Sequence, residues 1–209
     1  HVENKTGDDN IKNILIDIKE GAKFVVHEKE IFFLLVIASL VNFFIAAFNY
    51  LVPFTNTLFE DGSSYAALLS MGAAGSVLGA IFAKKIFKNS YNSILVSLAL
   101  CGMGLFLITP MYLFKLPTLV IVSGNLIFEF FLTIFNIHFF SMVQKKVPNE
   151  MLGRVFSTIF TVAVLLMPLS TALMTAVPFS VNVLGFAVIG SGVIIMSLVA
   201  YVYSKRYIQ

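Results

Sequence analysis

Six long apolar stretches constrain the fold of this chain more than any other feature of its sequence. They cover residues 31–52, 64–83, 94–113, 118–143, 155–176 and 181–203. Each is close to the roughly 20 residues that an α-helix needs to cross a bilayer. Lipid cannot hydrogen-bond exposed backbone amides, and the sequence lacks the period-2 alternation of a membrane β-barrel. It therefore predicts an all-α integral membrane bundle of six transmembrane helices.

The composition agrees with a membrane protein. Hydrophobic residues make up 58% of the 209 residues, and charged residues make up 12%, about half of the fraction that is typical of soluble domains. We therefore interpret the net charge of +3 as loop charge that sets topology, and expect no nucleic-acid partner. Cys101 is the single cysteine, and we interpret it as a small buried hydrophobe.

Residues 1–30 differ from the rest and are expected to form a cytoplasmic linker ahead of the bundle, which occupies residues 31–209. Within the linker, apolar residues recur at helical spacing over residues 11–29, with charged residues between them. This pattern predicts an amphipathic helix that is too polar to span a membrane. Two interpretations remain open: the helix lies along the membrane surface, or it is a linker helix packed on other loops.

Basic residues gather in alternate loops. They precede the first stretch and follow the second, fourth and sixth, where they include Lys88, Lys146 and Arg206. Positively charged loops stay in the cytoplasm. The sequence therefore predicts a multi-pass plasma-membrane protein with both termini in the cytoplasm.

Glu129 is the only charged residue in the six apolar stretches. An ionisable group at membrane depth is costly, and is by default a functional-site hypothesis. At 100° per residue it shares one polar stripe of its helix with four other residues, Thr118, Asn125, Thr133 and Asn136. A weaker stripe in the first stretch contains Asn42 and Asn49. The two stripes either line one cavity, or hold the bundle together through asparagine bonds.

Two roles are open for Glu129, because no Lys or Arg occurs in any of the six stretches. Burial without a cation favours the neutral form of a carboxyl. One role is proton coupling or cation binding, and the other is a neutral carboxyl that bonds to a neighbouring helix. We expect no metal or cofactor and no enzyme activity, because the sequence contains neither a His-Glu-x-x-His pair nor a glycine-rich phosphate loop.

Small residues lie on one face of the second stretch, at Gly72, Gly75 and Gly79. The Gly75-x-x-x-Gly79 spacing is typical of close helix packing in membranes. This face either packs statically or slides during a conformational cycle.

Two segments resemble a known family. Residues 17–27 (DIKEGAKFVVH) resemble the central cytoplasmic linker of major facilitator superfamily exporters, and residues 143–157 (VQKKVPNEMLGRVFS) resemble their loop between the tenth and eleventh helices. The most similar branch is that of the macrolide-efflux and siderophore-export drug:proton antiporters, which are bacterial. The matching positions of the second loop are Pro148, Glu150, Gly153 and Arg154. Residues 79–88 resemble a degraded copy of another family loop, which keeps Gly79, Lys84 and Lys88 but has Ala83 where an Asp is expected.

The resemblance implies that the chain is the C-terminal half of a twelve-helix transporter and works with an N-terminal six-helix half. The implied function is proton-coupled export of small hydrophobic or amphipathic compounds, such as drugs or macrolides, by alternating access. The alternative is a non-transporting membrane scaffold or assembly module.

Overall fold

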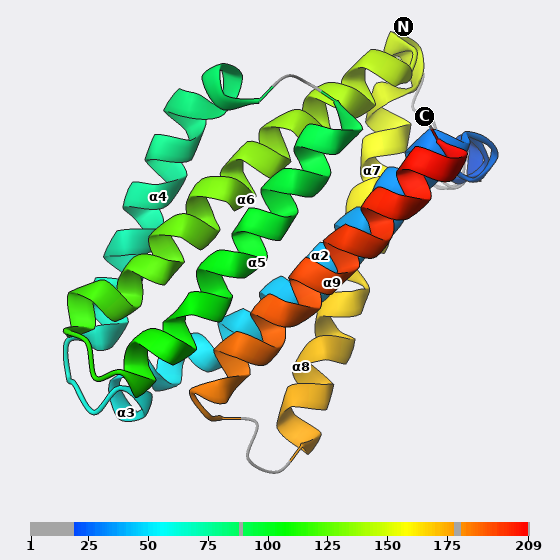
Figure 1. Cartoon of the computed structure of the whole chain (residues 1–209). Helices are drawn as coiled ribbons and strands as arrows, with labels where there is room; N and C mark the ends of the chain where they lie inside the picture. The colour runs from blue at the N-terminus through cyan, green and yellow to red at the C-terminus, as the bar shows by residue number, and fades with distance from the viewer. Residues whose placement is uncertain (1–18, 88–89, 178–180, 209) are drawn as a thin grey trace, which may run out of the picture.

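The computed structural model describes residues 19–87, 90–177 and 181–208, and these residues form helices and no strand (Figure 1). The elements are α2 (Lys29–Leu51), η1 (Val52–Phe54), α3 (Thr55–Leu58), α4 (Ser64–Ile86), α5 (Tyr91–Leu113), α6 (Thr118–Lys146), η2 (Asn149–Met151), α7 (Leu152–Val164), α8 (Leu166–Ala176) and α9 (Leu184–Tyr207). Six helical segments are long and apolar enough to cross a membrane. The prediction of an all-α, six-helix membrane bundle is confirmed.

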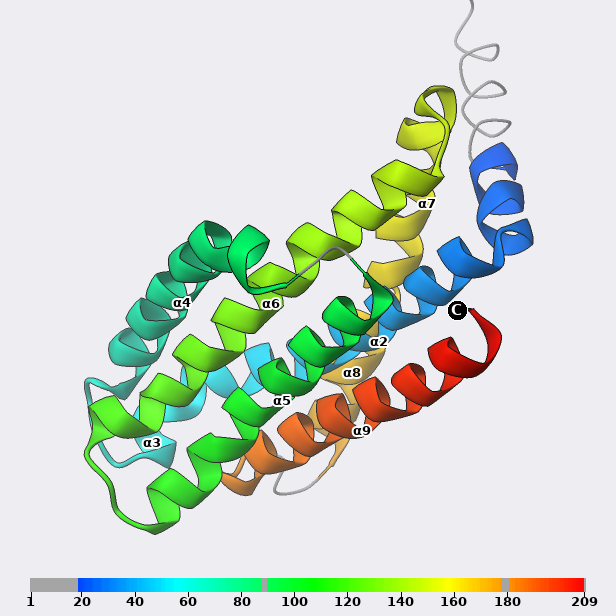
Figure 2. The same ribbon diagram turned by 45° about the horizontal axis from the view of Figure 1, so that its top comes forward.

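The helices follow a simple neighbour order, α4–α6–α5–α9–α2–α8, with α7 also packed on α2 (Figures 1 and 2). A weaker contact joins α2 to α6, two helices that are not neighbours in this row. Segments that are distant in sequence are therefore neighbours in space. The least buried spans are α4 and the α7–α8 pair, which occupy the two ends of the row.

Glycines mark the closest crossings. A Cβ on Gly102 of α5 would lie 2.7 Å from the Gly190 carbonyl oxygen of α9. A Cβ on Gly104 would lie at the same distance from the Gly124 carbonyl oxygen of α6. Because membrane helices gain little from hydrophobic burial against one another, such close backbone approach supplies much of their packing. The centre of the row is thus built on helix backbones in contact.

An aromatic cluster fills the space between these helices and α2. The ring of Phe48 lies 5.0 Å from that of Phe128 and 6.2 Å from that of Phe186, centroid to centroid. Phe186 is fully buried and also packs on Phe59. This cluster ties α2, α6 and α9 together at the end of the bundle where α3 lies.

Proline explains the interruption of the fifth apolar stretch. The fifth apolar stretch is two helices, α7 and α8, which meet at Leu165. Pro168 has no backbone N–H to donate to the carbonyl four residues earlier, at Val164, so the break falls where the helical bond is missing. Pro110 lies inside α5 near its end, and this helix continues to Leu113.

The described part of the amphipathic linker, residues 19–27, is helical. Its buried face consists of Gly21 and Val25. A Cβ on Gly21 would lie 2.7 Å from the Arg154 carbonyl oxygen, so this segment packs directly on the start of α7. Residues 1–18 of the predicted linker lie outside the described residues.

Candidate functional site

Glu129 lies midway along α6 and faces α4. Its Oε2 accepts a hydrogen bond from the Ser76 hydroxyl of α4 at 3.1 Å, and the side chain is half-buried. A serine hydroxyl is a neutral partner and provides no compensating charge. Glu129 forms no ion pair among the described residues.

Asn125 lies one helical turn before Glu129 and also bonds to α4. Its Nδ2 donates to the Leu68 carbonyl oxygen at 2.8 Å, and only 3% of the residue is exposed. Its Oδ1 is buried and has no hydrogen-bond partner within the described part of the chain. Buried acceptors are nearly always paired in folded proteins, so this oxygen is suited to receive a bond from a donor.

The glycine face of α4 is the surface against which this stripe packs. A Cβ on Gly72 would lie 2.7 Å from Asn125 Nδ2 and 3.3 Å from Glu129 Cγ. A Cβ on Gly79 would lie 3.0 Å from Thr133 Cβ. The structure thus brings together two features of the sequence that we had considered separately, because the small residues of α4 make room for the polar residues of α6.

The ends of the stripe have different environments. Thr118 donates its hydroxyl to Asp61 Oδ2 at 2.5 Å, in the turn that precedes α4. Asn136, at the other end, is exposed. Within the stripe, Asn125 is therefore buried, and Glu129 and Thr133 are half-buried.

The two asparagines of the first span lie apart from this section. Asn42 donates to the Ala38 carbonyl oxygen of its own helix at 3.0 Å. Asn49 is exposed and lines a groove of about 950 Å³ between α2 and the α7–α8 pair, together with Pro168, Thr171 and other residues of that pair. Glu129 does not line this groove.

Ion pairs from the linker and from α2 hold two residues at and after the end of α6. Arg154 Nη1 lies 2.5 Å from Glu20 Oε2. Lys146, in the last turn of α6, forms an ion pair with Glu30 of α2, and Glu30 also accepts a bond from the Tyr91 hydroxyl of α5. These contacts connect the linker to α7, and α2 to both α5 and α6, at one end of the bundle.

The other loop positions of the family resemblance have fewer contacts. Lys84, Pro148, Glu150 and Gly153 are exposed, and a Cβ on Gly153 would meet open space. Lys88 lies outside the described residues. Gly79, by contrast, packs on α6, as described above.

Sequence reasoning missed three residues of these contacts: Ser76, Glu30 and Tyr91. Ser76 lies one turn after Gly72 and therefore on the glycine face of α4, a position that signalled its contact with α6. No local pattern signals that Lys146 pairs with Glu30, because the two residues are 116 positions apart in the chain. Among the described residues, no group of three or more His, Cys, Asp and Glu side chains is placed to hold a metal ion.

Comparisons with known proteins add no relative. A scan against models of protein families, a search of curated proteins and a search of solved structures find no match for this chain.

Proposed function

We propose that this chain is part of a secondary active transporter that exports small hydrophobic or amphipathic compounds in exchange for protons. The single observation that carries the proposal is the environment of Glu129. This carboxyl lies at membrane depth, half-buried, with the neutral Ser76 hydroxyl as its hydrogen-bond partner. A carboxyl with this environment is costly in a purely structural role, and in membrane proteins such groups mark ion or substrate pathways.

The side-chain oxygen of Asn125 also supports the proposal. Its buried Oδ1 lies one turn from Glu129 and has no partner within the described residues. A protonated carboxyl, a water molecule or a substrate hydroxyl would each supply the missing donor. The segment between Asn125 and Glu129 is therefore suited to exchange hydrogen-bond partners as a proton or a substrate arrives.

The proposed coupling follows from two states of the carboxyl. When Glu129 carries a proton, it is neutral and compatible with the apolar surroundings of α6. When an aqueous path opens or a substrate binds, the ionised form becomes more favourable and the proton is released. Substrate capture and proton release are thereby linked, because the two states hold the proton with different affinity.

The exposed ends of the helix row are compatible with a larger assembly. On α4, Val77 and Ile81 are 60% and 59% exposed, and on α7–α8 Leu165 and Leu169 are 64% and 52% exposed. Lipid or a second six-helix half would cover these faces. In transporters built from two halves, the substrate site lies near the bilayer midplane where the halves meet, and Glu129 is in the middle of its span.

The test is transport by the full-length protein in vesicles with an imposed pH gradient, with the macrolide erythromycin as the probe. Glu129→Gln keeps the shape of the side chain but cannot ionise. We expect it to fold as the parent does, to lose accumulation driven by the gradient, and to keep downhill flux. Glu60→Gln is the matched control, since it removes an exposed carboxyl from the turn before α4 and should transport like the parent.

Two outcomes contradict the proposal. Full gradient-driven accumulation by Glu129→Gln would show that this carboxyl has a structural role only. Absence of any gradient-driven accumulation by the parent would contradict macrolide export. The first result would place the coupling proton at another residue, and the second would favour the alternative, a membrane scaffold in which the Ser76–Glu129 and Asn125–Leu68 bonds serve to hold α4 on α6.

A further inference from the structure

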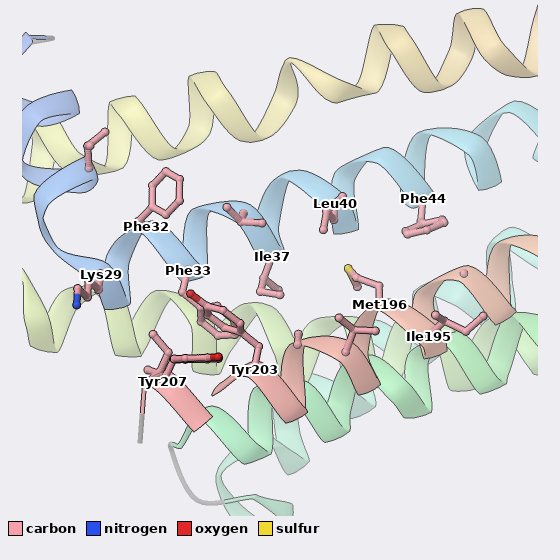
Figure 3. Close-up of a pocket in the computed structure, with 16 residues that line it drawn as sticks. Lys29, Phe32, Phe33, Ile37, Leu40, Phe44, Ile195, Met196, Tyr203 and Tyr207 are labelled. Atoms are coloured by element: carbon pink, nitrogen blue, oxygen red, sulfur yellow. The ribbon is translucent and has the colours of Figure 1, made fainter. Parts of the chain in front are cut away.

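A long apolar groove runs between α2 and α9 (Figure 3), and Glu129 is not among the residues that line it. Its volume is about 880 Å³. The wall on α2 is a ridge of large side chains four residues apart, at Phe32, Val36, Leu40 and Phe44. The wall on α9 is formed by residues on one face, including Ile195, Met196, Val199 and Tyr203.

The length of the groove matches one leaflet of a bilayer. Twelve residues separate Phe32 from Phe44, which is about 18 Å along a helix. Half of the hydrocarbon core of a bilayer is about 15 Å. The side chains along it remain open to the outside, since Ile195 and Val199 are 61% and 65% exposed. The groove therefore has the length and the lateral opening that a single lipid acyl chain requires.

The two ends of the groove differ in polarity. At one end, Phe44 packs against Gly192 and no polar side chain lines the wall. At the other end lie the ammonium of Lys29 and the rings of Tyr203 and Tyr207, as Figure 3 shows. The Tyr203 ring is stacked on Phe33 at 5.8 Å and lies 4.9 Å from the Tyr207 ring.

Positive charge at this end is not neutralised within the described residues. Lys29 is exposed and has no ion pair there. Its acidic neighbour Glu30 is engaged by Lys146 and Tyr91, whereas Glu28 is exposed. The last turn of α9 adds Lys205 and Arg206.

We propose that the groove between α2 and α9 binds an anionic phospholipid, with one acyl chain along the α2 ridge and the phosphate at Lys29. Basic pockets between membrane helices at the interface recognise anionic head groups. Tyrosine rings prefer the same depth, where their hydroxyls reach the head-group layer. A neutral apolar ligand would use the walls but not the cation, so the asymmetry of charge identifies an anionic lipid. The inference does not depend on the proposed transport function.

The experiment is native mass spectrometry of the full-length protein, titrated in detergent with phosphatidylglycerol and, separately, with phosphatidylcholine. The parent should bind phosphatidylglycerol more tightly than phosphatidylcholine. Lys29→Gln should weaken phosphatidylglycerol binding about fivefold, the effect of one basic residue near an anionic head group, and leave phosphatidylcholine binding unchanged. Lys85→Gln, at the exposed end of α4, is the control for loss of a lysine elsewhere.

A second pair of variants tests the acyl-chain path. Val199→Trp fills the groove and should weaken binding of both lipids. Leu198→Trp adds the same ring at the neighbouring position, which is 56% exposed but does not line the groove, and should leave both unchanged. Equal melting temperatures in lipid-free detergent establish that each variant is folded. Equal affinity of the parent for the two lipids, or unchanged binding by Lys29→Gln and Val199→Trp, would overturn the proposal.

Discussion

The interface between α4 and α6 is closely packed, whereas the interface between α2 and α9 leaves an open groove. On α4, glycines bring the backbone against α6, so that a Cβ on Gly75 would lie 3.1 Å from the Cα and carbonyl carbon of Leu126. Between α2 and α9, large side chains such as Phe44 and Met196 line the contact, and a groove of about 880 Å³ remains. The first interface leaves no space beside the glycines, and the second leaves enough for a ligand.

This difference also decides where polar groups are tolerated. Close approach places the Leu68 carbonyl and the Ser76 hydroxyl of α4 within hydrogen-bond distance of Asn125 and Glu129. A buried polar group without such a partner is costly in lipid. In the α2–α9 groove, by contrast, polar side chains occur only at the Lys29 end. The small residues of α4 thus allow polar side chains of α6 to be buried at the interface. The large residues of α2 and α9 leave an apolar groove with a charged residue at one end.

The largest effect is expected at the tight interface. Gly75→Leu should destabilise the bundle by about 3 kcal/mol, because the new side chain meets the Leu126 backbone, which cannot move aside locally. Ala74→Leu, at the exposed neighbouring position on α4, is the matched control and should have little effect. Thermal unfolding in detergent measures both. If the two variants unfold at the same temperature, α4 does not pack through its glycines.

A smaller effect is expected from the equivalent change at the open interface. A Cβ on Gly192 would lie 2.8 Å from Cζ of Phe44, and its nearest neighbours are atoms of this one ring. Because the ring borders the groove, it can turn into that space. Gly192→Ala should therefore cost less than about 1 kcal/mol, while Gly75→Ala costs more. Equal losses for the two alanine variants would remove the distinction between the interfaces.

The smallest effect concerns the turn that fixes the start of α6 against α4. Hydrogen bonds from the Thr118 hydroxyl and from the Ser63 amide and hydroxyl lower the pKa of Asp61. A carboxyl whose pKa is lower in the folded state stabilises the fold above its unfolded pKa and loses this effect as the pH falls through the folded value. The melting temperatures of the parent and Asp61→Asn should differ slightly but constantly from pH 5 to pH 8, and the difference should begin to shrink below about pH 4 and vanish once the pH is below the lowered folded pKa of Asp61. A difference that changes between pH 5 and pH 8 would contradict this assignment.

The sequence predicted what depends on local pattern. Apolar length identified the six spans, helical spacing grouped Asn125 with Glu129, and the Gly75-x-x-x-Gly79 motif marked a small face of α4. The sequence could not show that the glycine face of α4 packs against the polar stripe of α6, because contacts between distant segments determine which helices are neighbours.

The break at Leu165 and the ion pair between Lys146 and Glu30 show two further limits. A proline inside an apolar stretch favours a kink, but the apolar length of residues 155–176 alone predicted one continuous span, and the structure has α7 and α8 meeting at Leu165. The ion pair depends on how α2, α5 and α6 converge at one end. Its members looked like ordinary interfacial charges in the sequence.

The most direct test of the central claim is infrared spectroscopy of the full-length protein in vesicles across a pH titration. The claim is that the close α4–α6 interface holds a carboxyl that gains and loses a proton. On acidification of the parent, the infrared absorption of protonated carboxyl groups should appear. One component of this absorption should be missing in Glu129→Gln. The control variant Glu60→Gln should keep that component. Erythromycin should shift the titration midpoint of this component. A pH difference spectrum that is identical for the parent and Glu129→Gln would show that Glu129 does not titrate, and would contradict the account.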